Sequence, residues 1–330
     1  MSGADAARAP IAALGAGRMG RGIAIAFAYS GHPVRLIDAK ARDGAQFAAL
    51  AREARTEIRR TLEMLAGFGL LEPGEVEAVA GRVTLHGRDG LAAALAGVGV
   101  IFEGVPETLP AKEEALGLVS GLADPGAVIA STTSTILADQ LQGFVTGPER
   151  FLNAHWLNPA FLVPLVEVSP GAATDPAVTA RLCALLESIG KVPVICRASP
   201  GYIVPRIQAL AMNEAARLVE EGVASAEDID KATRYGFGFR FAVLGLLEFI
   251  DWGGGDILYH AGRYLAEATG QDRFAPPAII ERNMAEGRRG LRDGAGFLDY
   301  AGRDIAAWQR ERLAAFVAQL RHMDRLPRRG

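Results

Sequence analysis

Short apolar runs, separated by turns and helical stretches, fill the first two hundred residues of the chain. The first run, Ile11-Ala12-Ala13-Leu14, precedes a glycine turn and an apolar helix that reaches Tyr29. Similar runs occur at residues 34–38, 83–85, 98–102, 128–130, 151–154, 165–168 and 192–195. Strands that alternate with helices are typical of a parallel sheet covered by helices on both faces. We therefore predict an α/β fold with a doubly wound parallel sheet.

The pattern changes after Ser199, where the strand-like runs stop. Helical periodicity or length then dominates at residues 203–222, 226–235, 242–268, 276–287 and 304–322. We predict a domain of residues 1–198, with a helical excursion at about 43–80, followed by an all-α domain of residues 199–330. The apolar faces around Leu210 and Ile257 exceed what so small a helical domain buries, so we expect a homodimer through these helices.

Composition narrows the classes of function. The 330 residues carry a net charge of -3, which provides no field for nucleic acid or for an anionic membrane. Residues 1–10 lack the apolar core of a signal peptide, and no apolar run approaches membrane-spanning length. The two cysteines have neither metal nor redox spacing. We expect a cytoplasmic protein that acts on a small molecule and uses no metal.

The turn Gly15-Ala16-Gly17-Arg18-Met19-Gly20 lies between the first strand and the first helix, and Asp38 ends the second strand. In this context Gly15 makes the tight turn, Gly17 admits a pyrophosphate and Gly20 allows the helix to pack closely. The helix N-terminus, with Arg18 and Met19, would hold the pyrophosphate. Asp38 favours NAD over NADP, although Lys40 and Arg42 lie nearby. The alternative is a turn used for packing alone. This motif predicts a Rossmann-type domain.

One histidine and one carboxylate lie on neighbouring predicted strands, in Asn153-Ala154-His155-Trp156-Leu157-Asn158-Pro159 and in Leu165-Val166-Glu167-Val168. A histidine oriented by a buried carboxylate is a candidate general base. The alternative is a core histidine whose hydrogen bonds are satisfied. A hydroxyl-rich loop, Ser131-Thr132-Thr133-Ser134-Thr135-Ile136, follows another strand at the sheet edge where ligands bind, although Ser and Thr also cap helices.

Together these motifs resemble the L-3-hydroxyacyl-CoA dehydrogenase superfamily. The segments Glu103-Gly104-Val105-Pro106-Glu107, Ser199-Pro200-Gly201-Tyr202-Ile203-Val204 and Gly294-Ala295-Gly296-Phe297-Leu298-Asp299-Tyr300 extend the resemblance over nearly the whole chain. It implies NAD-dependent oxidation of the 3-hydroxyl of an L-3-hydroxyacyl substrate, such as 3-hydroxybutyryl-CoA in fatty acid metabolism. Ser134 would hold the 3-oxygen, His155 would remove the proton, and Glu167 would orient His155.

The resemblance also implies further contacts. Glu107 and Lys112 would line the nicotinamide side of the cofactor, unless Glu103, Glu107 and Lys112 only form a solvated helix start. Asn158 is a candidate polar contact to the substrate.

Two departures from the family pattern affect the substrate. Pro205 stands where the family has an asparagine, and the segment 236–245 resembles that of the L-gulonate and L-carnitine dehydrogenases. Arg240 is therefore a candidate carboxylate clamp for a free 3-hydroxy acid, or else a surface arginine over Phe239 and Phe241. Two other classes stay open: an NAD-binding structural protein without turnover, and an NAD-sensing regulator, which should carry a basic DNA-reading segment.

Overall fold

The computed structural model describes residues 8–328, so most of the N-terminal stretch that bears on export lies outside the described residues. The chain divides into two compact units, which part between Ala211 and Met212 inside one helix. The boundary that we expected near Ser199 stays a prediction. No helix of residues 8–328 has the length and apolar character needed to cross a membrane.

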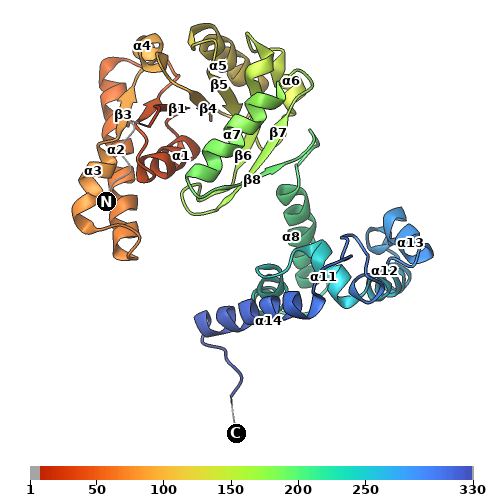
Figure 1. Cartoon of the computed structure of the whole chain (residues 1–330). Coiled ribbons are helices and arrows are strands. Elements are labelled where there is room, and N and C mark those ends of the chain that lie inside the picture. Colours follow the sequence, from red (N-terminus) through yellow and green to blue (C-terminus); the bar gives the residue numbers. More distant parts are fainter. Residues whose placement is uncertain (1–7, 329–330) are drawn as a thin grey trace. The chain divides into compact units, whose positions relative to one another are not determined.

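An eight-stranded sheet forms the centre of the first unit (Figure 1). Its strands are β1 (Ile11–Leu14), β2 (Val34–Ile37), β3 (Val83–His86), β4 (Val100–Glu103), β5 (Val128–Ser131), β6 (Phe151–Trp156), β7 (Leu165–Pro170) and β8 (Val192–Ile195). Their spatial order is β3-β2-β1-β4-β5-β6-β7-β8. The chain reverses direction across the sheet between β1 and β4, and this switch point is where ligands of such sheets bind.

The expected parallel, doubly wound sheet is confirmed, with one pair of neighbouring strands as the exception. β6 and β7 pair antiparallel, whereas the other neighbouring strands pair parallel. The reason is the connection: no helix crosses the sheet between Trp156 and Leu165, and a short loop can join only antiparallel neighbours. The reversal places β6 residues directly opposite β7 residues, with His155 paired to Glu167.

Helices cover both faces of the sheet, as the alternating apolar strands predict. They are α1 (Arg18–Tyr29), α2 (Gly44–Gly67), α3 (Val76–Ala80), α4 (Leu91–Leu95), α5 (Leu109–Leu122), α6 (Ala138–Gln142) and α7 (Pro176–Ser188). One apolar core joins the sheet to α1, α2 and α7, and a second joins its other face to α4, α5 and α6. Within the first core, the rings of Phe27, Phe102 and Trp156 contact one another. Alternation along β6 then turns His155 to the face opposite Trp156.

Helices make up the second unit, which begins inside α8 (Val204–Glu220). The others are α9 (Ala226–Ala232), a π-helical turn (Thr233–Gly238), α10 (Phe239–Phe241), α11 (Leu246–Gly253), α12 (Gly255–Thr269), α13 (Ala278–Ala285) and α14 (Ile305–His322). The single helix expected at 242–268 is two helices, because Gly254 adopts a φ of 105° between them.

A buried carboxylate organises the C-terminal glycine motif within this second unit. Asp251 is 1% exposed and accepts hydrogen bonds from the backbone N–H groups of Phe297 (2.9 Å) and Leu298 (2.8 Å). The hydroxyl of Tyr300 donates to it as well, at 3.1 Å. The motif 294–300 is therefore a loop wrapped around one carboxylate.

Candidate active site

The turn after β1 needs glycine at two positions. Gly15 has a φ of +102°, and a Cβ there would lie 2.6 Å from the carbonyl oxygen of Gly104. A Cβ on Gly20 would lie 1.9 Å from the carbonyl oxygen of Gly15. A Cβ on Gly17 would instead meet nothing within 4 Å. The turn is thus packed tightly against other backbone atoms at Gly15 and Gly20, whereas Gly17 has open space beside it that a ligand could occupy.

A cavity of about 380 Å³ lies beside this turn. It is lined by Gly15, Ala16, Gly17, Arg21, Asp38, Ala39, Lys40, Arg42, Leu50, Gly104, Val105 and Pro106. Helix α1 begins with the exposed Arg18 and the half-buried Met19, directly after the cavity-lining Gly17. Glycine backbone, a helix N-terminus and a carboxylate at the end of β2 are the groups that bind a pyrophosphate and a ribose, so these residues fit NAD.

Asp38 does not face the cavity as a free carboxylate. It is 5% exposed, and its Oδ2 atom accepts a hydrogen bond from Nε of Arg42. The backbone N–H of Lys40 lies 3.4 Å from Oδ1. Arg42, which the sequence indicated only as a nearby cation, is therefore the partner that partly neutralises Asp38.

His155 and Glu167 form a buried pair across the antiparallel strands. Nδ1 of His155 donates to Oε2 of Glu167 at 2.8 Å, and the side chains are 7% and 0% exposed. A carboxylate only accepts, so Nδ1 carries the proton and Nε2 is left to exchange one. Oε1 of Glu167 accepts the backbone N–H groups of Ile203 (2.9 Å) and Val204 (2.8 Å). The carboxylate is thus fixed on both oxygens.

Glu107 organises the hydroxyl-rich loop after β5. Its Oε1 atom accepts the Thr133 hydroxyl, the backbone N–H groups of Ser134 (2.9 Å) and Thr135 (3.0 Å), and the Thr135 hydroxyl (3.0 Å). Partial burial alone would raise the pKa of Glu107, but the hydrogen bonds and nearby Lys112 hold that pKa below its ordinary value. The Ser134 side chain is exposed and makes no hydrogen bond within residues 8–328. Its hydroxyl is free for a ligand.

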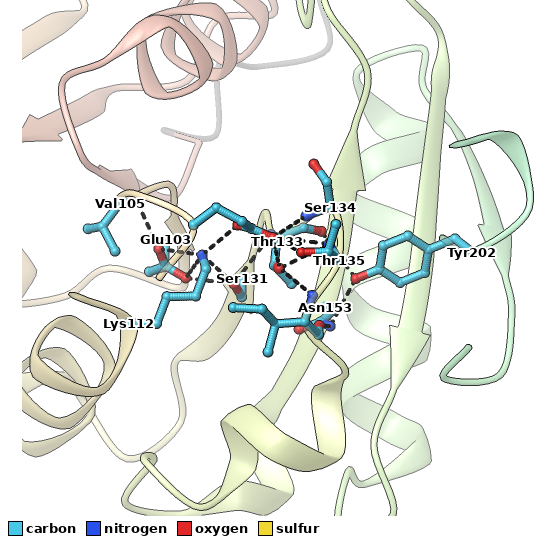
Figure 2. A network of polar contacts seen from close by, with 11 residues as sticks. Glu103, Val105, Lys112, Ser131, Thr133, Ser134, Thr135, Asn153 and Tyr202 are labelled. Atoms are coloured by element: carbon cyan, nitrogen blue, oxygen red, sulfur yellow. Dashed lines mark hydrogen bonds and ion pairs between the residues drawn. The ribbon is translucent and has the colours of Figure 1, made fainter. Parts of the chain in front are cut away.

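A second buried ion pair lies beneath this loop (Figure 2). Lys112 and Glu103 are 1% and 0% exposed, and Nζ lies 3.1 and 3.0 Å from the two carboxylate oxygens. The Ser131 hydroxyl (2.6 Å) and the Val105 N–H (2.7 Å) also donate to Glu103. The solvated helix start was the wrong interpretation for Glu103 and Lys112, because the lysine folds inward onto the carboxylate. Lys112 lies in the interior, 3.5 Å from Glu107.

The sequence interpretation missed Tyr202 and Asn153. The Tyr202 ring stacks on His155, with centroids 5.2 Å apart and an interplanar angle of 17°. Its hydroxyl donates to the Thr133 carbonyl (3.1 Å) and accepts from Nδ2 of Asn153 (3.0 Å). Strand alternation could have found Asn153, which lies two residues before His155 and so faces the same side of β6. Nothing in the sequence indicated the position of the Tyr202 ring.

The two candidate substrate contacts have separate surroundings. Asn158 is exposed in the loop after β6, before the cis peptide bond to Pro159. Arg240 is exposed in the second unit, where its guanidinium lies 5.4 Å from the ring centroid of Phe249 rather than over Phe239 or Phe241. It forms no salt bridge within residues 8–328. Those residues also contain no cluster of three metal-ligating side chains.

A doubly wound sheet with a glycine turn and an acidic strand end is typical of a dinucleotide-binding enzyme. Residues 10–199 match the model of the NAD binding domain of 3-hydroxyacyl-CoA dehydrogenase, and residues 201–300 match that of its C-terminal domain. The chain belongs to the 3-hydroxyacyl-CoA dehydrogenase family.

Relatives with different substrates are similar to this chain. The 5-formyl-3-hydroxy-2-methylpyridine 4-carboxylate 5-dehydrogenase of Mesorhizobium japonicum is 32% identical over 95% of this chain and 98% of its own. The 3-hydroxyadipyl-CoA dehydrogenase of Escherichia coli is 33% identical over 88% of this chain and 58% of its own length. The crystal structure of an Archaeoglobus fulgidus 3-hydroxyacyl-CoA dehydrogenase matches with a TM-score of 0.75 at 29% identity, over 97% of this chain and 100% of its own.

Proposed function

We propose that this enzyme oxidises the 3-hydroxyl of a short L-3-hydroxyacyl-CoA, such as 3-hydroxybutyryl-CoA, to the 3-oxo compound. The observation that carries the proposal is the buried His155–Glu167 pair, together with the free hydroxyl of Ser134 on the neighbouring loop. A family that acts on 3-hydroxyacyl-CoA compounds supports the substrate class.

Each polar residue then has a defined task. Bound NAD supplies the acceptor for the hydride that leaves C3. The Ser134 hydroxyl hydrogen-bonds the 3-oxygen of the substrate and keeps it in place. Nε2 of His155 takes the hydroxyl proton, and Glu167 stabilises the imidazolium that results. Because Nδ1 is held by Glu167 at 2.8 Å, the free nitrogen has one orientation.

The cofactor contacts follow from the cavity. Gly15, Gly17 and Gly20, with the N–H groups of Arg18 and Met19 at the start of α1, would hold the pyrophosphate. Asp38 would accept from the ribose hydroxyls. Glu107 and Lys112 would act on the nicotinamide side through the Thr133–Thr135 loop, because Lys112 is buried against protein groups.

A second candidate substrate is a free 3-hydroxy carboxylate of the L-gulonate or L-carnitine type. The pyridine carboxylate dehydrogenase among the relatives, the exposed Arg240 and Pro205 at the start of α8 favour it. Asn158 stays a candidate polar contact for either substrate.

An assay of NADH formation separates the candidates. We expect turnover with 3-hydroxybutyryl-CoA, and none with free acids. If a free acid is instead the substrate, Arg240→Met should raise its KM about tenfold or more, because a charge-assisted hydrogen bond contributes roughly 1.5 to 3 kcal/mol. Arg234→Met, in the π-helical turn that precedes α10, is the control. Turnover of free acids alone would overturn the thioester proposal, and no turnover at all would favour the structural-protein alternative.

The assembly proposal is a homodimer through the C-terminal helices. Leu210, Ile257 and Tyr264 are 59%, 64% and 70% exposed, which is unusual for large apolar side chains. Light scattering of the purified protein should give twice the chain mass, whereas a monomer at micromolar concentration would contradict it. A location in the cytoplasm and a role in fatty acid metabolism also stay predictions.

A further inference from the structure

Tyr202 connects two parts of the candidate site that the chain brings in from separate strands. Its ring lies on the imidazole of His155. Its hydroxyl reaches the Thr133 carbonyl, next to Ser134 (Figure 2). All of these residues belong to the first compact unit. Among the hydrogen bonds and ring contacts of residues 8–211, only those of Tyr202 join the candidate base to the serine loop.

The contacts leave Tyr202 little freedom. It is 5% exposed and has a φ of 45°, a left-handed conformation that a bulky residue adopts only when its surroundings hold it there. Burial raises the pKa of its hydroxyl above the ordinary value, which keeps the group neutral and able to donate. The two residues that follow, Ile203 and Val204, donate their N–H groups to Glu167.

The loop that carries Ser134 is held at both ends by the same pair of residues. Asn153 donates to the Ile136 carbonyl at 2.9 Å and to the Tyr202 hydroxyl at 3.0 Å, and Tyr202 donates to the Thr133 carbonyl at 3.1 Å. Glu107 holds the N–H side of the loop, so the carbonyl side depends on Asn153 and Tyr202.

We propose that Tyr202 is a positioning residue. Its ring fixes the orientation of the His155 imidazole, and its hydroxyl fixes the position of the Ser134 loop relative to that imidazole. The inference rests on the proposed roles of His155 and Ser134. Proton removal by His155 and the hydrogen bond from Ser134 act on one oxygen, so their relative placement controls the rate even though Tyr202 touches no reacting atom.

Two substitutions separate the ring from the hydroxyl. Tyr202→Phe keeps the stacking and removes the tie to Thr133. We expect kcat to fall about twofold to tenfold, the effect of one neutral hydrogen bond, with the Kd for NAD unchanged. Tyr202→Leu also removes the stacking, and we expect kcat to fall roughly tenfold to a hundredfold, because an aromatic contact adds a similar increment.

Tyr29→Phe is a matched control, since the Tyr29 hydroxyl also donates to a backbone carbonyl, that of Leu70, but contacts neither His155 nor the loop. The decisive readout is the isotope effect on kcat/KM with 3-hydroxybutyryl-CoA deuterated at C3. A misplaced base and serine make hydride transfer more rate-limiting, so this isotope effect should rise in both Tyr202 variants and stay at the parent value in Tyr29→Phe.

His155→Ala, measured in parallel, separates this inference from the proposed function. Parent-like turnover in His155→Ala would overturn the proposed function. An inactive His155→Ala together with parent-like kcat and isotope effect in Tyr202→Phe would overturn the positioning role alone. Thermal unfolding will show whether Tyr202→Leu folds. If it does not, Tyr202→Phe alone decides whether Tyr202 is a positioning residue.

Discussion

Two fully buried glutamates lie in the same sheet, and their partners give them different capacities. Glu103, at the end of β4, receives hydrogen bonds from Lys112, the Ser131 hydroxyl and the Val105 N–H. Glu167, on β7, receives two backbone N–H groups and Nδ1 of His155. Both carboxylates are 0% exposed, so burial does not distinguish them.

The difference lies in the partner that carries the proton. The ammonium of Lys112 is buried between both carboxylate oxygens of Glu103 and the Ser131 hydroxyl, so the Glu103 cluster is a fixed ion pair next to the loop. A histidine can gain and lose a proton near neutral pH, and His155 keeps one ring nitrogen free. The comparison teaches that a buried carboxylate becomes part of a catalytic pair only when its partner can exchange a proton with a third molecule.

The largest expected effect is on stability at the fixed pair. Lys112→Met leaves Glu103 buried without a counter-charge, and we expect a loss of about 3 to 5 kcal/mol of unfolding free energy. Urea denaturation measures it. Lys231→Met, which removes a lysine from the exposed pair with Asp228, should change stability little. Similar losses in the two variants would mean that burial at Lys112 carries no special cost.

The next largest effect is on turnover, when the His155–Glu167 pair is changed. Glu167→Gln keeps an acceptor for the N–H groups of Ile203 and Val204 but loses the charge that stabilises the imidazolium. We expect turnover to fall about tenfold to a hundredfold, roughly 1.4 to 2.7 kcal/mol, with NAD binding unchanged. Glu187→Gln on the exposed side of α7 is the control. A parent-like rate would make Glu167 a structural carboxylate like Glu103.

A third carboxylate, Asp38, is paired with Arg42, and the question is whether this pairing abolishes its selection of NAD over NADP. We expect NAD to exceed NADP by about tenfold or more in kcat/KM, because a 2'-phosphate would meet a carboxylate. Asp38→Ser should narrow the ratio by releasing Arg42 toward that phosphate, and Asp38→Ser combined with Arg42→Met should lose the gain. Equal efficiencies in the parent would show that Lys40 or Arg42 already controls the pocket.

The smallest effect is a pH dependence at Glu107, which contacts both Lys112 and the Thr133–Thr135 loop. Its folded-state pKa is lowered from the ordinary 4.5, so its contribution to stability is present above pH 4.5 and is lost as the pH falls through the lower folded-state value. The melting temperature of the parent should exceed that of Glu107→Gln at neutral pH, and the difference should shrink in acid. A difference in melting temperature that stays constant with pH would contradict a stabilising role for the ionised Glu107 carboxylate.

Much of this site could be predicted from the sequence, because strand alternation and motif order place His155, Glu167 and the glycine turn. The assignment of His155 and Glu167 to catalysis stays a prediction. The interior position of Lys112 could not be predicted, since a lysine near a helix start is usually solvated and only the fold brings Glu103 beneath it. The antiparallel β6–β7 pair depends on the absence of a crossover helix. The Tyr202 ring depends on a left-handed backbone conformation that no local pattern specifies.

The most direct test of the account is the turnover of His155→Ala at saturating NAD and substrate, with the Kd for NAD measured on the same protein. If His155 takes the substrate proton and Glu167 stabilises the imidazolium that results, turnover should fall about a hundredfold to ten-thousandfold, roughly 3 to 5 kcal/mol of barrier, while the Kd stays nearly unchanged. Turnover within about threefold of the parent would contradict the account, because His155 would then be a buried histidine as structural as Lys112.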